Sequence, residues 1–170
     1  MTDKKKKART RRRPEFEDTE EAARAAAVRL LARREYARGE LEQRLRSRGY
    51  GRERVTAVLA ELEQDGYLSD ARFAEHVVRT RIDRGNGPMK IRAELSRHGV
   101  ADAEIERALA DAECDFAALA AEARERRFGE AGPRDLSDKA RQARFLAQRG
   151  FRSEDMRDCL DLDPADPGLE

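Results

Sequence analysis

The stretch that decides the fold runs from Gly66 to Val100 and reads GYLSDARFAEHVVRTRIDRGNGPMKIRAELSRHGV. Gly66 favours a helix end, and Ser69 is a good N-cap for the helix that follows. Apolar residues then recur at helical spacing until Gly85-Asn86-Gly87 interrupts them, and Pro88 suits the first turn of a further helix. We therefore predict two consecutive helices, each with an apolar side and a cationic side.

The composition is that of a highly charged chain with little material for one thick core. Of the 170 residues, 42% are charged, 5% are aromatic and none is Trp. Ala, Arg, Glu and Leu are abundant and no convincing alternating strand pattern occurs, which favours helices nearly everywhere. No apolar run is long enough to span a membrane and no signal peptide is found, so we expect a soluble, cytoplasmic protein.

A repeat of about 50 residues organises the chain. Gly49, Gly99 and Gly150 are 50 and 51 residues apart, and their surroundings share the pattern L-x3-G-φ-x4-φ-x3-L, where φ is apolar. Each Gly is expected to end the second helix of a unit. The last leucine of the pattern is an expected core position in every unit: Leu59, Leu109 and Leu160. We predict an all-α fold of three tandem three-helix repeats that form an elongated, curved array.

Loop signals between the helices set the expected boundaries of the repeats. We predict repeats over residues 20–66, 67–113 and 114–162. The first two helices of the first repeat are expected to break at Arg38-Gly39. In the third repeat, two glycines and a proline within residues 127–135 predict a longer first loop.

The two ends of the chain have the composition of tails. We expect residues 1–19 to be disordered, basic and then acidic, and residues 163–170 to be a disordered acidic tail. Residues 1–13 carry eight Lys or Arg and one Asp. This block is either a tether for nucleic acid or another anionic surface, or simply a solvated tail.

Charge follows the repeat. Residues 76–98 hold six bases and two acids, whereas residues 99–123 hold one base and seven acids. Either neighbouring helices neutralise one another through weak surface ion pairs, or the array presents a basic strip to a polyanion or an acidic protein surface. For the second interpretation, the candidate partner-binding residues are the bases of this segment, all expected to be exposed: Arg79, Arg81, Arg84, Lys90, Arg92 and Arg97.

Motifs for catalysis or metal binding are not found, so we expect neither an enzyme nor a metal or other cofactor. The chain has no glycine-rich phosphate loop, no GxSxG and no paired His. His98 aligns with Arg48 and Arg149 in the repeat, which indicates a surface basic position. Cys114 and Cys159 form no CxxC, and Cys159 falls on an apolar stripe as a small core residue. Bases spread over all units do not favour a single helix-turn-helix recognition helix.

These residues resemble the RecX regulatory proteins, which modulate the RecA recombinase, over about residues 22–162. The first signature of that family is matched by Gly66 to Ala74, Gly85 to Pro88, Ile91, Glu94-Leu95 and Gly99-Val100. The second is matched by Arg127-Phe128-Gly129, Lys139, and Arg144 to Phe151. Ser69 stands where the family usually has Asp, an exchange between two good capping residues. In the first signature we expect structural roles, with the apolar residues packed between units: Gly66, Tyr67, Leu68, Asp70, Arg72 and Phe73.

The resemblance implies a bacterial protein that binds the RecA filament on single-stranded DNA within its helical groove. It would inhibit strand exchange, ATP hydrolysis and coprotease activity by halting filament growth or promoting disassembly. We expect a monomer, with single- and double-stranded DNA as further candidate partners. Two alternatives stay open: a DNA-binding helical-repeat protein without a recombinase partner, and a helical scaffold for an unrelated protein.

Overall fold

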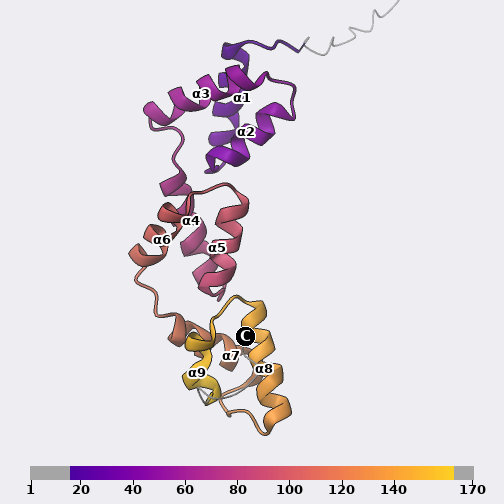
Figure 1. Ribbon diagram of the computed structural model, residues 1–170, viewed down its shortest axis with the longest axis vertical. Helices are drawn as coiled ribbons and strands as arrows, with labels where there is room; N and C mark the ends of the chain where they lie inside the picture. The colour runs from indigo at the N-terminus through magenta and orange to yellow at the C-terminus, as the bar shows by residue number, and fades with distance from the viewer. Residues whose placement is uncertain (1–15, 163–170) are drawn as a thin grey trace, which may run out of the picture.

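The computed structural model describes residues 16–162, and all regular elements in that range are α-helices. The first repeat contains α1 (Glu20–Leu31), α2 (Arg38–Arg46) and α3 (Arg52–Gln64). The second contains α4 (Asp70–Asp83), α5 (Pro88–Arg97) and α6 (Asp102–Asp111). The third contains α7 (Phe116–Phe128), α8 (Leu136–Gln148) and α9 (Ser153–Leu160). The predicted all-α fold of tandem three-helix repeats is confirmed (Figure 1).

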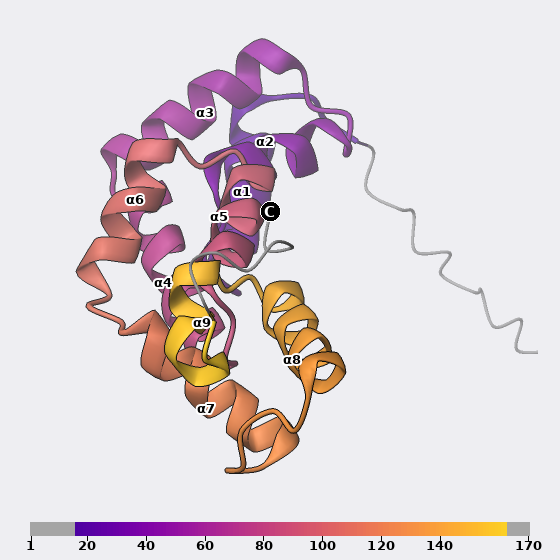
Figure 2. The same cartoon turned by 60° about the horizontal axis from the view of Figure 1, so that its bottom comes forward.

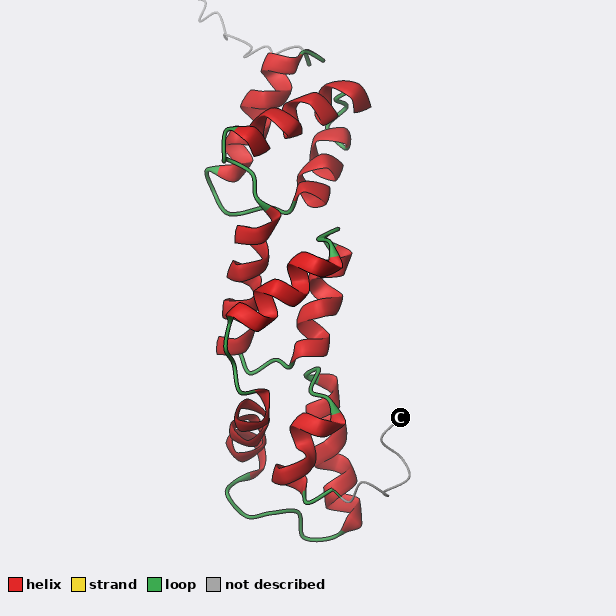
Figure 3. Cartoon of the chain, turned by 60° about the vertical axis from the view of Figure 1, so that its left-hand side comes forward, coloured by secondary structure: helices red, strands yellow, loops and turns green. Residues whose placement is uncertain are grey.

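The repeats follow one another along the long axis of an elongated, bent array (Figures 1 and 2). The second helices α2, α5 and α8 lie along one side of the array, and the third helices α3, α6 and α9 lie along the other. Loops connect the repeats, and Figure 3 shows that they run at the outside of the helical units. The fold therefore separates the basic second helices from the acidic third helices.

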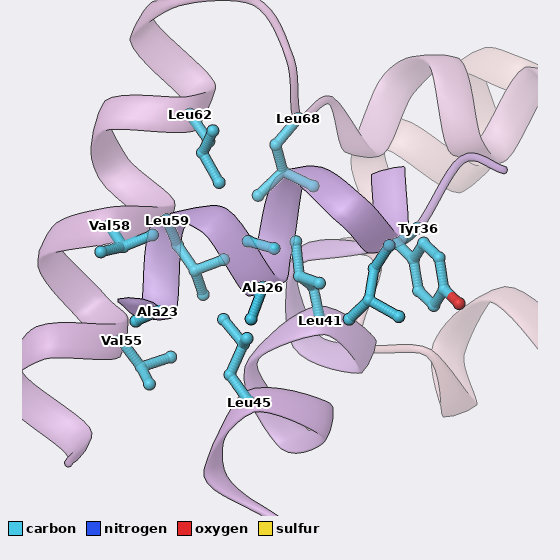
Figure 4. Packing of buried hydrophobic residues seen from close by; sticks show 12 residues of the cluster. Ala23, Ala26, Tyr36, Leu41, Leu45, Val55, Val58, Leu59, Leu62 and Leu68 are labelled. Atoms are coloured by element: carbon cyan, nitrogen blue, oxygen red, sulfur yellow. The ribbon is translucent and has the colours of Figure 1, made fainter. Parts of the chain in front are cut away.

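Each repeat has its own hydrophobic core. In the first core, side chains from α1, α2 and α3 converge between the helices (Figure 4). The three leucines that the repeat register makes equivalent, Leu59, Leu109 and Leu160, are 0%, 8% and 1% exposed. Their burial, each in the core of its own repeat, confirms that the three positions are equivalent.

The three aligned glycines end the second helices as predicted. Gly49, Gly99 and Gly150 have φ of 102°, 81° and 89°, a left-handed conformation that other residues rarely adopt. The residue after each glycine donates its N–H back to the leucine four positions before the glycine: Tyr50 to Leu45 (3.4 Å), Val100 to Leu95 (3.2 Å) and Phe151 to Leu146 (3.2 Å). The cap thus repeats in geometry as well as in sequence.

The predicted break at Arg38-Gly39 is wrong. Helix α1 already ends at Leu31, and Arg38 and Gly39 are the first residues of α2. Glycine is needed there because a Cβ on Gly39 would lie 2.9 Å from the carbonyl oxygen of His98 in the second repeat. This glycine therefore marks a close approach between repeats, which a single sequence cannot distinguish from a helix end.

Residues 16–19, which we assigned to a disordered tail, lie against the first repeat. The Phe16 ring is 5.0 Å from the Tyr50 ring, and Asp18 accepts a hydrogen bond of 3.0 Å from the Gly51 N–H. Asp18 also pairs with Arg54 at 2.6 Å. Specific contacts with Tyr50 and with the start of α3 thus hold this segment, and composition does not predict them. Residues 1–15 and 163–170, including the basic block, lie outside the described residues.

The third repeat contains a buried polar cluster beside its small apolar core. The predicted longer loop spans residues 129–135, between α7 and α8. The side chain of Arg124 is 5% exposed and donates to the carbonyl oxygens of Ala131 (2.9 Å) and Glu130 (3.2 Å). It also donates to Gln142 Oε1 at 3.4 Å. The loop is thus fixed from inside by one arginine, because a buried guanidinium group needs hydrogen-bond acceptors.

Candidate partner-binding surface

The second helices meet end to end, so that free backbone groups of one helix satisfy those of the next. At the junction of repeats two and three, Gly87 and Met89 at the start of α5 donate their N–H groups to the carbonyl oxygens of Arg149 and Gly150 at the end of α8. These bonds are 2.8 and 3.0 Å long. The first N–H groups of a helix and its last carbonyls lack partners within the helix. Here they pair with each other, so α5 and α8 form one continuous column.

The first junction uses a side chain for the same purpose. Asp70, the first residue of α4, accepts a hydrogen bond of 2.7 Å from the N–H of Arg38 at the start of α2. From sequence we had expected a structural role for Asp70 without naming its partner. The carboxylate caps the second helix of the preceding repeat, a role that requires knowledge of how the repeats stack.

The remaining residues of the first signature divide between core and surface. Leu68 and Phe73 are 2% and 3% exposed and belong to the first and second cores, as expected. Arg72 links the repeats by donating to Glu35 (3.2 Å) and to the carbonyl oxygen of Tyr67 (3.2 Å). Tyr67 itself is 56% exposed, so the expectation that it packs between units is wrong. Tyr67 lies in the loop between α3 and α4, directly after Gly66, whose φ is 74°.

His98 is a junction residue and not a simple surface base. Its Nδ1 lies 3.5 Å from Glu40 Oε2 in the first repeat, and its ring meets the Phe73 ring edge-on at 5.3 Å. Arg149, at the equivalent position of the third repeat, donates to the carbonyl oxygens of Arg84 and Gly85, at 3.1 Å each. Each of these side chains thus reaches the preceding repeat, whereas Arg48 in the first repeat is exposed.

Two of the six candidate bases are engaged in ion pairs inside the second repeat. Arg81 on α4 holds Glu94 on α5 through two hydrogen bonds of 2.5 and 2.6 Å. Arg92 on α5 holds Glu106 on α6 in the same way, at 2.6 and 2.7 Å. The Arg81 and Arg92 side chains are only 24% and 25% exposed, so the expectation that they are exposed is wrong.

The paired carboxylates have lowered pKa values. Hydrogen bonds from Arg81 lower the pKa of Glu94, and hydrogen bonds from Arg92 lower that of Glu106. The partners lie 13 and 14 residues apart in sequence, on adjacent helices, so the helical pattern of either helix alone does not predict them. Neutralisation between neighbouring helices therefore accounts for part of the charge pattern.

The other four candidate bases are exposed: Arg79, Arg84, Lys90 and Arg97. Within the described residues, the side chains of Arg79, Arg84 and Lys90 have no partner, and Arg97 contacts only its own helix, through the Ala93 carbonyl oxygen. Further unpaired, exposed bases occur on the other second helices or just after them and were not among our candidates: Arg46, Arg48 and Arg144. The sequence did indicate further basic surface there, because segments 24–54 and 124–157 hold ten bases each. The second helices thus carry unpaired positive charge in every repeat.

A groove crosses this side of the array where repeats one and two meet. It is lined by the facing ends of α2 and α5, with Arg44, Arg48, Arg97 and His98 supplying basic groups. Glu40 is its acidic lining residue. Burial would raise the pKa of Glu40, but hydrogen bonds from Arg34 and Arg44 outweigh it and hold that pKa below its usual value. The groove therefore favours anionic groups.

Other kinds of site find little support between residues 16 and 162. That segment holds no cluster of three His, Cys, Asp or Glu residues that could bind a metal ion, and none of its helices could span a membrane. Burial raises the pKa of both thiols, Cys114 and Cys159. Cys159 packs against the third core, which confirms the interpretation from its stripe position.

Comparison with known protein families matches each of the three repeats to a separate family model. Family models of the RecX first, second and third three-helix domains match residues 23–62, 69–109 and 113–160. The Regulatory protein RecX of Halorhodospira halophila is 50% identical over 137 residues, which cover 81% of this chain and 85% of that protein. The Regulatory protein RecX of Chromohalobacter salexigens is 47% identical over 143 residues, covering 84% and 93%.

Solved structures share the fold. The crystal structure of RecX from Lactobacillus salivarius matches with a TM-score of 0.69 at 24% identity, covering 81% of this chain and 91% of that one. A crystal structure of regulatory protein RecX matches with a TM-score of 0.71 at 22% identity, covering 84% and 72%. With all three domains matched in order, and with relatives at such identity over most of its length, this chain belongs to the RecX family of regulatory proteins.

Proposed function

We propose that this protein is a non-enzymatic, cytoplasmic regulator that binds the RecA filament on single-stranded DNA. It inhibits recombinase, ATPase and coprotease activities by limiting filament growth or promoting filament disassembly. The observation that carries the proposal is the ordered match of all three repeats to the RecX domains. Family membership supports the RecA filament as the partner, and the surface of the array offers candidate contacts.

The proposed contact surface is the side of the array formed by the second helices α2, α5 and α8 (Figure 1), referred to below as the column. A nucleoprotein filament is a long polyanion, and an extended array that carries unpaired bases in each repeat can follow it over several subunits. Unpaired bases of the second repeat are the proposed contacts with the filament: Lys90 and Arg97 on α5, Arg84 at the junction of α5 and α8, and Arg79 on α4. Arg81 and Arg92 are assigned to stability instead, because each already holds a carboxylate with two hydrogen bonds.

Charge reversal tests this surface. The variant Arg84→Glu, Lys90→Glu, Arg97→Glu should keep the parental helicity and melting, because exposed unpaired charges contribute little to stability. Its inhibition of the DNA-dependent ATPase of the recombinase should fall by roughly tenfold or more, as expected when several charge contacts are lost. Co-sedimentation with preformed filaments, with bare single-stranded DNA as the control, measures binding directly.

A matched variant separates position from net charge. Arg29, Arg52 and Arg157 are exposed, have no side-chain partner within residues 16–162, and lie on α1, α3 and α9, outside the second repeat. Reversing these three to Glu changes the net charge by the same amount and should spare inhibition. Equal losses in both variants would mean that the overall field acts and not the column. Parental inhibition by the folded column variant would remove these bases from the mechanism.

A further inference from the structure

A second groove lies in the third repeat, between the end of α7 and α8, beside the junction residue Arg149, whose guanidinium carbon lies 4.8 Å from the centre of the Phe145 ring. Its lining consists of three arginines, two phenylalanines and a glutamine: Arg127, Arg141, Arg144, Phe128, Phe145 and Gln148. None of these residues is acidic. Both flanking segments belong to the second family signature, of which Arg127 and Phe128 have no role in the cores, the caps or the junctions described above.

The groove combines aromatic rings with guanidinium groups. The Phe128 and Phe145 rings meet edge-to-face, with centroids 5.3 Å apart and an interplanar angle of 87°. The Arg127 and Arg141 guanidinium carbons lie 5.5 and 5.3 Å from the centre of the Phe128 ring. Such planar groups beside an aromatic face extend the surface on which another flat group can stack.

The walls of the groove are held in place from behind. Arg141 is fixed by Asp138, whose Oδ1 lies 2.5 Å from Nη2 of the arginine. Asp138 is 8% exposed and also accepts the N–H of Arg134. Arg124 anchors the loop that separates Phe128 from α8. A site whose side chains are already ordered binds without a large ordering cost.

The positive charge of the groove is not compensated. Arg127 and Arg144 are exposed and form no ion pair within the described residues, and the single carboxylate at the site, Asp138, lies behind Arg141. Arginine presents N–H groups in a planar fork that matches phosphate oxygens. The groove therefore offers phosphate donors directly beside a stacking surface.

We propose that this groove binds single-stranded nucleic acid, with a base stacked against Phe128 and its flanking guanidinium groups and with phosphates held by Arg127 and Arg144. An acidic peptide would use the charge but not the rings, since carboxylate side chains have no extended flat face. A duplex would present phosphates but keep its bases stacked inside. The combination of rings and arginines favours an unpaired strand, independently of any recombinase.

The test uses the full chain and a fluorescent 12-mer of deoxythymidine, measured by anisotropy against an abasic 12-mer of equal charge. The parent should bind the thymidine strand more tightly than the abasic strand. Phe128→Leu should weaken binding of the thymidine strand by about 5- to 100-fold, the range for losing one stacked base, and should remove the preference. Phe128 is suited to this change because it does not belong to the third core. Any contribution of residues 1–13 is common to all variants and cancels.

Salt dependence separates the two functions within the groove. Arg127→Gln with Arg144→Gln should reduce the slope of log affinity against log salt by about 1.4, because each phosphate contact on a single strand contributes about 0.7. Phe128→Leu should leave that slope unchanged. The matched control Arg52→Gln with Arg157→Gln removes two exposed bases elsewhere and should alter neither slope nor preference.

Several results would overturn the proposal. One is equal binding of the thymidine and abasic strands by the parent, and another is equal binding of a duplex. A third is competition by polyglutamate that Phe128→Leu does not affect, which would identify an acidic peptide as the ligand. Circular dichroism of every variant checks that the third repeat is folded. Because no recombinase is present, these results do not depend on the filament-binding function.

Discussion

Replacing Gly87 by alanine is predicted to uncouple the third repeat from the second. Gly87 is the N-cap of α5 and has φ −81°, so alanine adopts its backbone conformation without strain. The added methyl group would overlap the carbonyl carbon and oxygen of Gly150 and the nitrogen of Phe151. All three are backbone atoms, which cannot rotate away, so the ends of α5 and α8 must separate.

The cost follows from the bonds that this separation breaks. The hydrogen bonds Gly87 N–H to Arg149 and Met89 N–H to Gly150 contribute about 0.5–1.5 kcal/mol each. The bonds from the Arg149 guanidinium to Arg84 and Gly85 add a smaller amount, because that side chain is partly exposed. We expect a loss of about 2–4 kcal/mol of coupling between the repeats. At 1.4 kcal/mol per factor of ten, exchange of the Met89 amide should accelerate by about 30- to 1,000-fold.

Hydrogen exchange and urea unfolding measure the effect. In a linear array each repeat is stabilised by its neighbour, so the variant should unfold in two steps, with the third repeat first. Gly51→Ala is the matched control, because Gly51 is also an N-cap, at φ −63°. A Cβ there would meet only the ends of the Arg54 and Asp18 side chains, at 3.0 and 3.3 Å, and these can move. Identical exchange and unfolding of the two variants would refute the close contact at Gly87.

Two further predictions concern the individual repeats. Leu109→Ala should destabilise the middle repeat by about 2–5 kcal/mol, as for other buried leucines, and a circular dichroism melt that overlays the parent would show that Leu109 is not core. Asp138 has its pKa lowered to about 2, chiefly by the hydrogen bond from the Arg134 N–H, with burial acting in the opposite direction and with Arg141 and Gln142 contributing. Its contribution to stability is therefore complete above the ordinary value of 3.8 and is lost as the pH falls toward 2. Urea unfolding of the parent and of Asp138→Asn between pH 5 and pH 2 should show a stability difference that shrinks only below about pH 4, and a constant difference would contradict the role of the charge.

Features that lie within one repeat could be predicted from the sequence. The equivalence of Leu59, Leu109 and Leu160 and the glycine caps depend on contacts between residues at most about ten positions apart. Helical periodicity and capping preferences act over that range. For the same reason the N-cap at Ser69 was predicted correctly, and its side chain accepts the N–H of Arg72.

Features that lie between repeats could not be predicted in this way. Gly39 looked like a helix end because a glycine required by a neighbouring backbone has the same sequence signature as one required by a left-handed turn. His98 looked like a surface base because the first repeat, with which we aligned it, has no preceding repeat for Arg48 to contact. In the candidate site, Arg81 and Arg92 looked free because their carboxylates lie on adjacent helices.

The two junctions between repeats pair the free N–H groups at a helix start with different chemical groups. The internal sequence repeat therefore does not specify how neighbouring repeats are joined. Both must supply acceptors for the free N–H groups at the start of a second helix. At the first junction the carboxylate of Asp70 reaches back to Arg38, but the N-cap of α7, Asp115, accepts from Ala117 and Ala118 of its own helix. With no such side chain at the second junction, the backbone of α8 itself must approach α5, which is possible only where Gly87 and Gly150 leave room. The first junction therefore combines one side-chain cap with the close approach of Gly39 to the His98 carbonyl oxygen, whereas the second pairs backbone with backbone between two glycines. A groove in the third repeat and bases on the second are thus held at a defined separation, as a surface that follows one extended ligand requires.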